Sequence, residues 1–285
     1  MEPEQFEPGL PPERQARRHV LDLDLLNVYL VARLGLTRRV GVELEVPYRE
    51  VRVDATFLDE EGERLAGFES IHHRTETISG LADLQLVGRF RFQVPAAGEE
   101  GWILDALGGV TLPTGGTEPD PFELGEEGHE HQHIFFGTGT VDPVAGLEGY
   151  RRWGQTQGTG WVRLRVPVDE NSHGFRAGTR VSAGFGVQPP FRLAAVDLLA
   201  QLEAYHEEAS RWGDQAARNS GRTDLILNFG ATWAPSPHWS LYAILKLPEN
   251  LDAEGGQLDL SPSISVGLTH SFHFGGEEDE EGHDH

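Results

Sequence analysis

Most of this chain alternates apolar with polar residues, and it does so in about eleven separate runs. Between Asp224 and Trp233 the odd-numbered positions are Leu, Leu, Phe, Ala and Trp, whereas the even-numbered positions are small or polar apart from Ile226. A β-strand places successive side chains on opposite faces of its sheet. The alternation therefore predicts strands that have one apolar face and one polar face.

The polar face of these predicted strands carries full charges in the middle of the strand. Arg89 and Arg91, for example, alternate with Phe90 and Phe92. A water-soluble barrel would carry its charges outside and its apolar residues inside. A charged face opposite a smooth aliphatic and aromatic face is typical of a β-barrel with lipid outside and water inside. We therefore predict an all-β fold, a transmembrane antiparallel up-and-down β-barrel.

The connections between the predicted strands alternate between short and long. The strands are expected at residues 19–34, 40–53, 81–94, 102–112, 140–153, 160–168, 175–188, 191–206, 223–233, 239–247 and 261–274. Short periplasmic turns and long outer loops are the pattern of outer-membrane barrels, which in bacteria have an even number of strands. We therefore expect about twelve strands, with ten as the alternative. The eleven predicted runs are one strand short of twelve. The twelfth strand would come from residues before His19 or from one long run that contains two strands.

The pattern divides the chain into three parts. Residues 1–18 are rich in proline and charge and predict an irregular lead-in, residues 19–274 form the barrel, and residues 275–285 form an acidic tail that contains histidine. The first five residues are acidic and polar and do not resemble a secretory leader. Because an outer-membrane protein must be exported, we expect that a leader has been removed before Met1.

The composition narrows the classes of function. The formal net charge is −23, which argues against nucleic acid as a partner because phosphate binding needs a cationic surface. The absence of cysteine excludes disulfides and thiolate metal sites. Mean hydropathy is −0.40, and no apolar run approaches the roughly 18 residues of a spanning helix. The acid is concentrated in predicted loops, where it either solvates them or attracts cations to a pore mouth.

Aromatic residues near the predicted strand ends indicate the girdles that mark membrane interfaces. They are Tyr48, Trp102, Trp153, Trp161, Tyr205, Trp233 and Trp239. We therefore expect the protein to lie in the lipid bilayer of the bacterial outer membrane. We expect it to be a monomer.

Four segments resemble parts of a known family. Residues 80–92 read GLADLQLVGRFRF, residues 109–115 read GVTLPTG, residues 136–143 read FGTGTVDP, and residues 261–272 look like the closing strand of outer-membrane proteins. In that order they resemble the outer-membrane transporters grouped as the MetA-pathway of phenol degradation family. The resemblance implies a barrel placed by the outer-membrane insertion machinery and the uptake of small, often aromatic compounds. It transfers no catalytic residue.

The charged residues of the polar faces are candidates for the lining of a lumen. By the same period of two, these are Asp83, Arg89, Arg91, Asp105, Arg163, Arg165, Arg176, Arg180, Glu203, Asp224 and Lys246. They can form a salt-bridge network that fills and stiffens the barrel. Alternatively, they form an arginine ladder that faces acids across a pore and orients an anionic or polar solute.

Three histidines lie two residues apart in a predicted long loop: His129, His131 and His133. In an extended segment they face the same way, and neutral imidazole is a good ligand for Zn, Cu or Ni. Glu127 or Glu130 could add an oxygen ligand. Any such site would capture or sense a divalent metal, because nothing around it supports catalysis.

Enzyme motifs are absent: the chain has no G-x-S-x-G, no H-E-x-x-H and no P-loop. We therefore predict no enzyme, no catalytic residue and no required cofactor. The predicted function is a channel or transporter for the passive passage of a small solute through a charged lumen. The solute could be an aromatic or hydrophobic compound. The alternative is a plugged barrel whose His-rich and acid-rich outer loops bind a metal or a partner. A third interpretation is a soluble all-β binding protein, which would fold without detergent.

Overall fold

The computed structural model describes residues 18–65, 74–96, 100–131, 133–193, 195–253 and 260–272. Their architecture is a single large antiparallel sheet, which confirms the predicted all-β fold. Its eleven successive strands are β1 (Arg18–Gly35), β2 (Val40–Leu58), β4 (Leu84–Gln93), β5 (Trp102–Leu112), β6 (Asp142–Trp153), β7 (Thr156–Arg165), β9 (Arg180–Gln188), β11 (Val196–Glu207), β14 (Arg222–Ser236), β15 (Trp239–Ala253) and β16 (Ser263–His270). Each strand pairs with the next along the chain, which is the up-and-down order.

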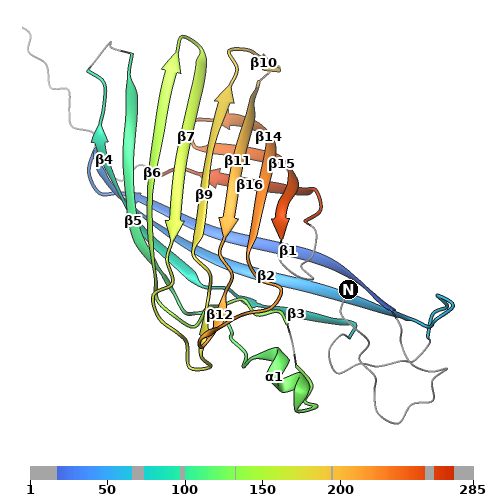
Figure 1. The fold of residues 1–285 in the computed structure, drawn as a ribbon. Helices are drawn as coiled ribbons and strands as arrows, with labels where there is room; N and C mark the ends of the chain where they lie inside the picture. Colours follow the sequence, from blue (N-terminus) through green and yellow to red (C-terminus); the bar gives the residue numbers. More distant parts are fainter. Residues whose placement is uncertain are drawn as a thin grey trace, which may run out of the picture.

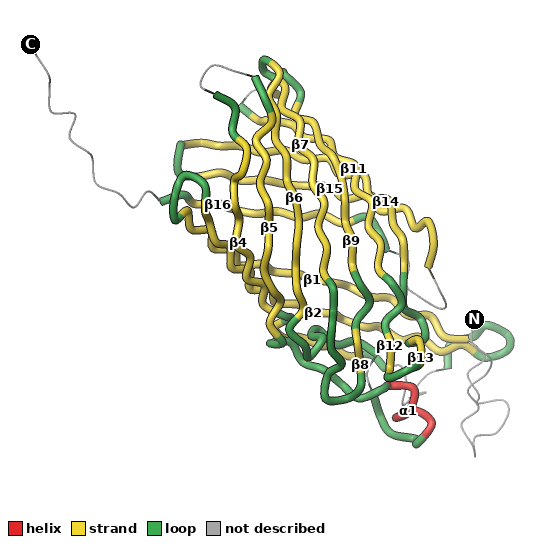
Figure 2. Tube along the Cα trace, turned by 60° about the vertical axis from the view of Figure 1, so that its left-hand side comes forward, coloured by secondary structure: helices red, strands yellow, loops and turns green. Residues whose placement is uncertain are grey.

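Two further strands attach to this path. β3 (Glu76–Leu81) pairs with the second half of β2, where it continues the line of β4, and β10 (Arg192–Leu193) pairs with β11. Figures 1 and 2 show the sheet curling strongly, so that the strands at its two ends cross the direction of β6 and β7 steeply. Among the described residues, β1 and β16 are not hydrogen-bonded to each other.

The strand count differs from the expected twelve. The described path holds eleven strands, and none of its long runs folds back to give a second strand. Residues 1–17, from which we expected a twelfth strand or an irregular lead-in, lie outside the described residues, as does the tail 273–285. The predicted run 175–188 is also divided, into β8 (Phe175–Arg176) and β9. Gly178 lies in this break, and a Cβ there would lie 1.8 Å from the carbonyl oxygen of Glu208, so only glycine fits at this close approach of two segments.

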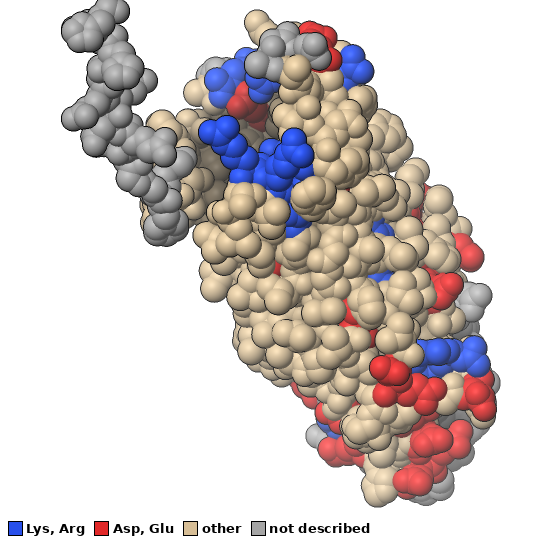
Figure 3. Space-filling view, turned by 90° about the vertical axis from the view of Figure 1, so that its left-hand side faces the viewer, with Lys and Arg blue, Asp and Glu red and all other residues tan. Residues whose placement is uncertain are grey.

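The two faces of the sheet have the predicted character. Leu227, on the apolar face of β14, is 40% exposed, whereas its polar neighbour Asn228 is 3% exposed. The three largest fully buried side chains are all carboxylates, Asp105, Asp142 and Asp224. Charge buried inside and apolar side chains exposed outside reverse the arrangement of a water-soluble protein. Figure 3 shows one face of the molecule, whose middle carries few charged side chains, with acidic side chains gathered at one end.

The short and long connections lie at opposite ends of the sheet, as predicted. The short end has the turns at residues 36–39, 154–155 and 237–238. The long end has the loops at residues 166–179 and 208–221, together with the described parts of the connections from β2 to β3, from β5 to β6 and from β15 to β16. The long end also carries α1 (Pro121–Glu126) and a small sheet of β8, β12 (Arg211–Trp212) and β13 (Gln215–Ala216), labelled at the lower end of Figure 2. No helix in the described part of the chain is long and apolar enough to cross a membrane.

Candidate functional site

The inner face of the sheet carries two groups of charged side chains at different heights. We call the first group the inner tier; it consists of Arg89, Arg91, Asp105, Glu148, Tyr150 and Arg163. We call the second group the outer tier; it lies nearer the long loops and consists of Asp83, Thr138, Thr140, Asp142 and Arg165.

The strand register explains why the inner tier forms. Asp105 on β5 lies directly opposite Arg91 on β4 and Glu148 on β6, so all three side chains are on the same face. Asp105 accepts hydrogen bonds from Arg91 Nε at 2.8 Å and from Arg89 Nη1 at 3.0 Å. The Asp105 side chain is fully buried, and its pairing with two guanidinium groups offsets the cost of removing a carboxylate from water.

Glu148 joins three donors from three different positions. Its two carboxylate oxygens accept from Arg89 Nη1 at 2.6 Å, from Arg163 Nη2 at 2.6 Å and from the Tyr150 hydroxyl at 2.7 Å. Through Arg89, Asp105 and Glu148 belong to one connected network across β4, β5, β6 and β7. The structure thus brings together four of the predicted lumen residues, Arg89, Arg91, Asp105 and Arg163.

The outer tier ties a long loop to the end of the sheet. Asp83 accepts hydrogen bonds from the backbone N–H of Gly115 at 3.1 Å and from the backbone N–H and hydroxyl of Thr138, both at 2.9 Å. Because Gly115 and Thr138 lie near the two ends of loop 113–141, one carboxylate fixes both ends. Arg165 Nε donates to the fully buried Asp142 at 2.9 Å.

Two smaller clusters continue this level around the sheet. Arg180 on β9 pairs with Glu207 on β11 at 3.0 Å, and Tyr205 also donates to Glu207. On β14, Arg222 Nε donates to Asp224 at 2.6 Å, and Asn250 donates to the same carboxylate at 3.1 Å. The predicted residues Arg165, Arg180 and Asp224 are therefore all held in ion pairs at the long-loop end.

The remaining three predicted lumen residues lie apart from these networks. Arg176 belongs to β8 in the loop sheet, paired with Arg211, so its assignment to a barrel strand was wrong. The break at Gly178 interrupts the period of two on which that assignment depended. Lys246 lies on the inner face of β15 opposite Asn228, and Glu203 lies on the inner face of β11 opposite Gly184.

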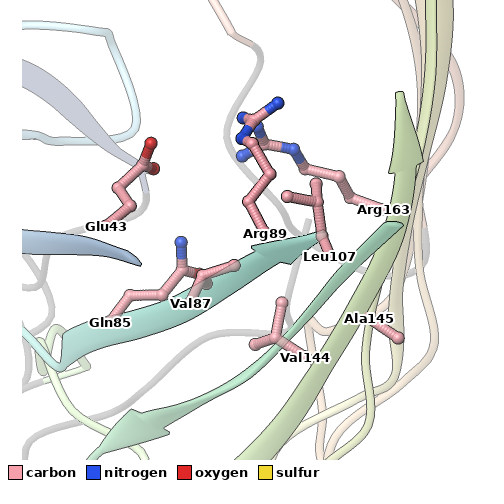
Figure 4. Close-up of a pocket in the computed structure, with 8 residues that line it drawn as sticks. All are labelled: Glu43, Gln85, Val87, Arg89, Leu107, Val144, Ala145 and Arg163. Carbon is pink, nitrogen blue, oxygen red and sulfur yellow. The ribbon is translucent and has the colours of Figure 1, made fainter. Parts of the chain in front are cut away.

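Cavities remain on both sides of the inner tier. In Figure 4, Arg89 and Arg163 approach each other above Leu107, and Glu43 of β2 lies across from them; the enclosed space is about 20 Å³. A larger cavity of about 340 Å³ lies against β6, β7, β9 and β11. Arg163 lines both cavities, and its ion pair with Glu148 therefore lies between them.

Several residues of these networks were missed by the sequence-based prediction. Asp142, Glu148 and Tyr150 occupy alternate positions of β6, opposite the outward Leu147, and the same period of two would have found them. Two girdle assignments were wrong. Trp161 lines the larger cavity, and Tyr205 donates to Glu207 on the inner face. By contrast, Trp102, Trp153, Trp233 and Trp239 are exposed near the short-turn end, as a girdle requires.

The three loop histidines do not converge. The Nε2 atoms of His131 and His133 are 3.2 Å apart, whereas the His129 imidazole lies 3.6 Å from the Glu127 carboxylate. Within the described residues, no group of three or more His, Cys, Asp or Glu side chains is placed to hold a metal ion. The predicted three-imidazole site is therefore not formed in this arrangement of the loop, in which the His131 imidazole lies next to His133 and the His129 imidazole lies next to Glu127.

Comparison with known proteins supports the fold. A scan against protein-family models and a search of curated proteins find no match. Among solved structures, the chain is similar to the crystal structure of the COG4313 outer membrane channel from Pseudomonas putida F1. The likeness covers 87% of this chain and 82% of that chain, with a TM-score of 0.53 and 15% sequence identity. At this level of identity, the likeness shows that the two chains share a fold, the antiparallel up-and-down sheet described above.

Proposed function

We propose that this protein is a bacterial outer-membrane β-barrel channel. A small solute, such as an aromatic or hydrophobic compound, would diffuse passively through its charged lumen. The observation that carries this proposal is the reversed arrangement of the sheet. Apolar side chains such as Phe229 and Leu227 are exposed on the outer face, while Asp105 and Asp224 are buried inside. A lipid bilayer is the surrounding that makes such a surface stable.

The proposed pathway passes the inner tier. Arg163 is 43% exposed on its side chain although it pairs with Glu148, so a guanidinium group faces open space inside the sheet. Charged side chains that line a pore set its ion preference. The cavity of about 340 Å³ beside this pair would hold a small organic molecule.

Conductance in planar lipid bilayers tests the proposal. The purified full-length protein should insert and give discrete current steps in simple salt solutions. Insertion is checked separately, because a folded outer-membrane barrel migrates differently on a gel before and after boiling. A protein that inserts into the bilayer and gives no current at any applied voltage would overturn the channel proposal.

A plugged barrel that serves as an anchor for binding loops is the second candidate, and one observation favours it specifically. The inner tier connects four adjacent strands through paired charges, and such a network can close a passage as well as line it. In this case the loops would carry the activity, with the neighbouring His131 and His133 imidazoles as the start of a divalent-metal site. Metal binding without conductance would favour this candidate over the channel.

A further inference from the structure

The larger cavity contains a row of side chains that the ion-pair networks leave partly unused. Glu148, Trp161, Gly184 and Glu203 lie directly opposite one another on β6, β7, β9 and β11. Directly opposite residues of antiparallel strands point to the same face, so this row crosses the inner wall. Trp161 and Glu203 both line the cavity of about 340 Å³.

Gly184 allows the indole ring of Trp161 to cover the wall. A Cβ at position 184 would lie 2.4 Å from Cζ2 and 2.6 Å from Cη2 of that ring. Any larger residue would therefore push the indole away from the sheet. The ring extends from β7 across Gly184 toward β11, where Glu203 is the next residue in the row. An aromatic face thus lies beside a carboxylate inside the cavity.

The two carboxylates of this cavity differ in their partners. Glu148 accepts hydrogen bonds from Arg89, Arg163 and the Tyr150 hydroxyl. The Glu203 side chain forms no hydrogen bond or ion pair with any residue that the structure describes. Its carboxylate is therefore available to a ligand in the cavity.

The wall beside the indole offers a further polar atom. The hydroxyl oxygen of Thr159 is buried and lacks a hydrogen-bond partner within the described part of the chain. Thr159 lies opposite Gly186, and a Cβ there would be 3.0 Å from that oxygen. The two glycines of β9 thus leave room for the side chains that cover them, Trp161 over Gly184 and Gln201 over Gly186.

We propose that this cavity is a binding site for a small organic cation that carries a ring. The ammonium group would pair with Glu203, and the ring would lie on the indole of Trp161, which also attracts the cation through its π face. A cavity of about 340 Å³ accommodates a single-ring amine. This inference rests on the proposed channel function only in that the solute reaches the site through the lumen.

Calorimetry on the full-length protein in detergent tests the site with three matched probes: benzylammonium, benzyl alcohol and benzoate. The ring is the same in each probe and only the charge differs. Benzylammonium should bind at least tenfold more tightly than benzyl alcohol, and benzoate should bind most weakly. Glu203→Gln should remove the preference for the cation, whereas Trp161→Leu should weaken both benzylammonium and benzyl alcohol.

Control variants separate the site from a loss of folding. Glu50→Gln removes a carboxylate from the outer face of β2 and should leave all three affinities unchanged. Glu203→Asp keeps the charge and withdraws it by one methylene, so it should weaken benzylammonium only in part. Tightest binding of benzoate, equal binding of the three probes, or no effect of Glu203→Gln would overturn the proposal.

The site and the channel can fail independently in these experiments. Binding in detergent does not require conduction. A protein that binds benzylammonium and gives no current would therefore refute the channel proposal and support the binding site. A protein that conducts and binds none of the probes would refute the binding site and support the channel proposal.

Discussion

Replacing Leu227 by arginine tests which face of the sheet meets lipid. Leu227 lies on the outer face of β14, six residues before the exposed Trp233 at the short-turn end. With a rise of about 3.4 Å per residue and a tilt of about 40°, each residue advances about 2.5 Å across the bilayer. An apolar band about 25 Å tall therefore takes about ten residues, and its midplane falls next to Leu227.

The magnitude follows from this depth. Arginine at the midplane on a lipid-facing position costs about 2–4 kcal/mol. At about 1.4 kcal/mol per tenfold, the ratio of folded to unfolded protein in lipid vesicles should fall roughly 30- to 700-fold. The assay is urea titration of folding into phosphatidylcholine vesicles, followed by tryptophan fluorescence and by the gel shift on boiling.

The matched control places the same arginine on the other face. Gln201 on β11 lies at nearly the same depth, because it pairs with Asn228 while the neighbouring Leu202 pairs with Leu227. Its side chain lines the larger cavity, which has room for a guanidinium group. Gln201→Arg should therefore fold nearly as well as the natural protein. Equal urea midpoints for the two variants, or a greater loss for Gln201→Arg, would refute the assignment of faces.

Three further predictions concern the tiers and the loop. Asp83→Ala removes three hydrogen bonds that hold loop 113–141, so a glutamate-specific protease should cleave that loop at least tenfold faster. Arg163→Gln removes one partner of Glu148 and should shift the reversal potential in a salt gradient toward cations. His131→Ala with His133→Ala should weaken zinc and copper binding, measured by calorimetry, because it removes the two neighbouring imidazole ligands.

Each of these predictions has an outcome that contradicts it. Unchanged cleavage in Asp83→Ala, when Asp54→Ala serves as the control, would show that the outer tier does not hold the loop. An unchanged reversal potential in Arg163→Gln would place the conducting path away from the inner tier. Identical metal isotherms after deletion of residues 275–285, with and without the histidines, would leave the loop as solvated surface.

The alternation of apolar and polar residues was sufficient to predict most strands of the main sheet and the direction of their side chains. The run expected at 223–233 forms β14 at Arg222–Ser236, and Arg89, Arg91 and Asp105 face inward as predicted. This succeeds because burial alternates along a strand whichever solvent lies outside. The division of the run at 175–188 could not be read in this way. At this break Gly178 lies against the Glu208 carbonyl, a contact between segments distant in sequence.

The position of Trp161 shows a different limit. We expected its strand to begin at residue 160, which placed the indole at an interface, whereas β7 begins at Thr156 and Trp161 lies within it. Its odd number, shared with Arg163 and Arg165, already indicated the inner face. The contact with Gly184 depends on the register between β7 and β9, which no single sequence run specifies.

The odd number of strands in the described path has a consequence for the seam between β1 and β16. Because every neighbouring pair is antiparallel, the first and eleventh strands run in the same direction. A direct junction between them would be parallel, with slanted and evenly spaced hydrogen bonds. Exposed N–H and C=O groups in the hydrocarbon of a bilayer cost several kcal/mol each. One segment running opposite to both strands would complete both edges by antiparallel pairing. The strand directions alone therefore allow the seam between β1 and β16 to accept an added strand.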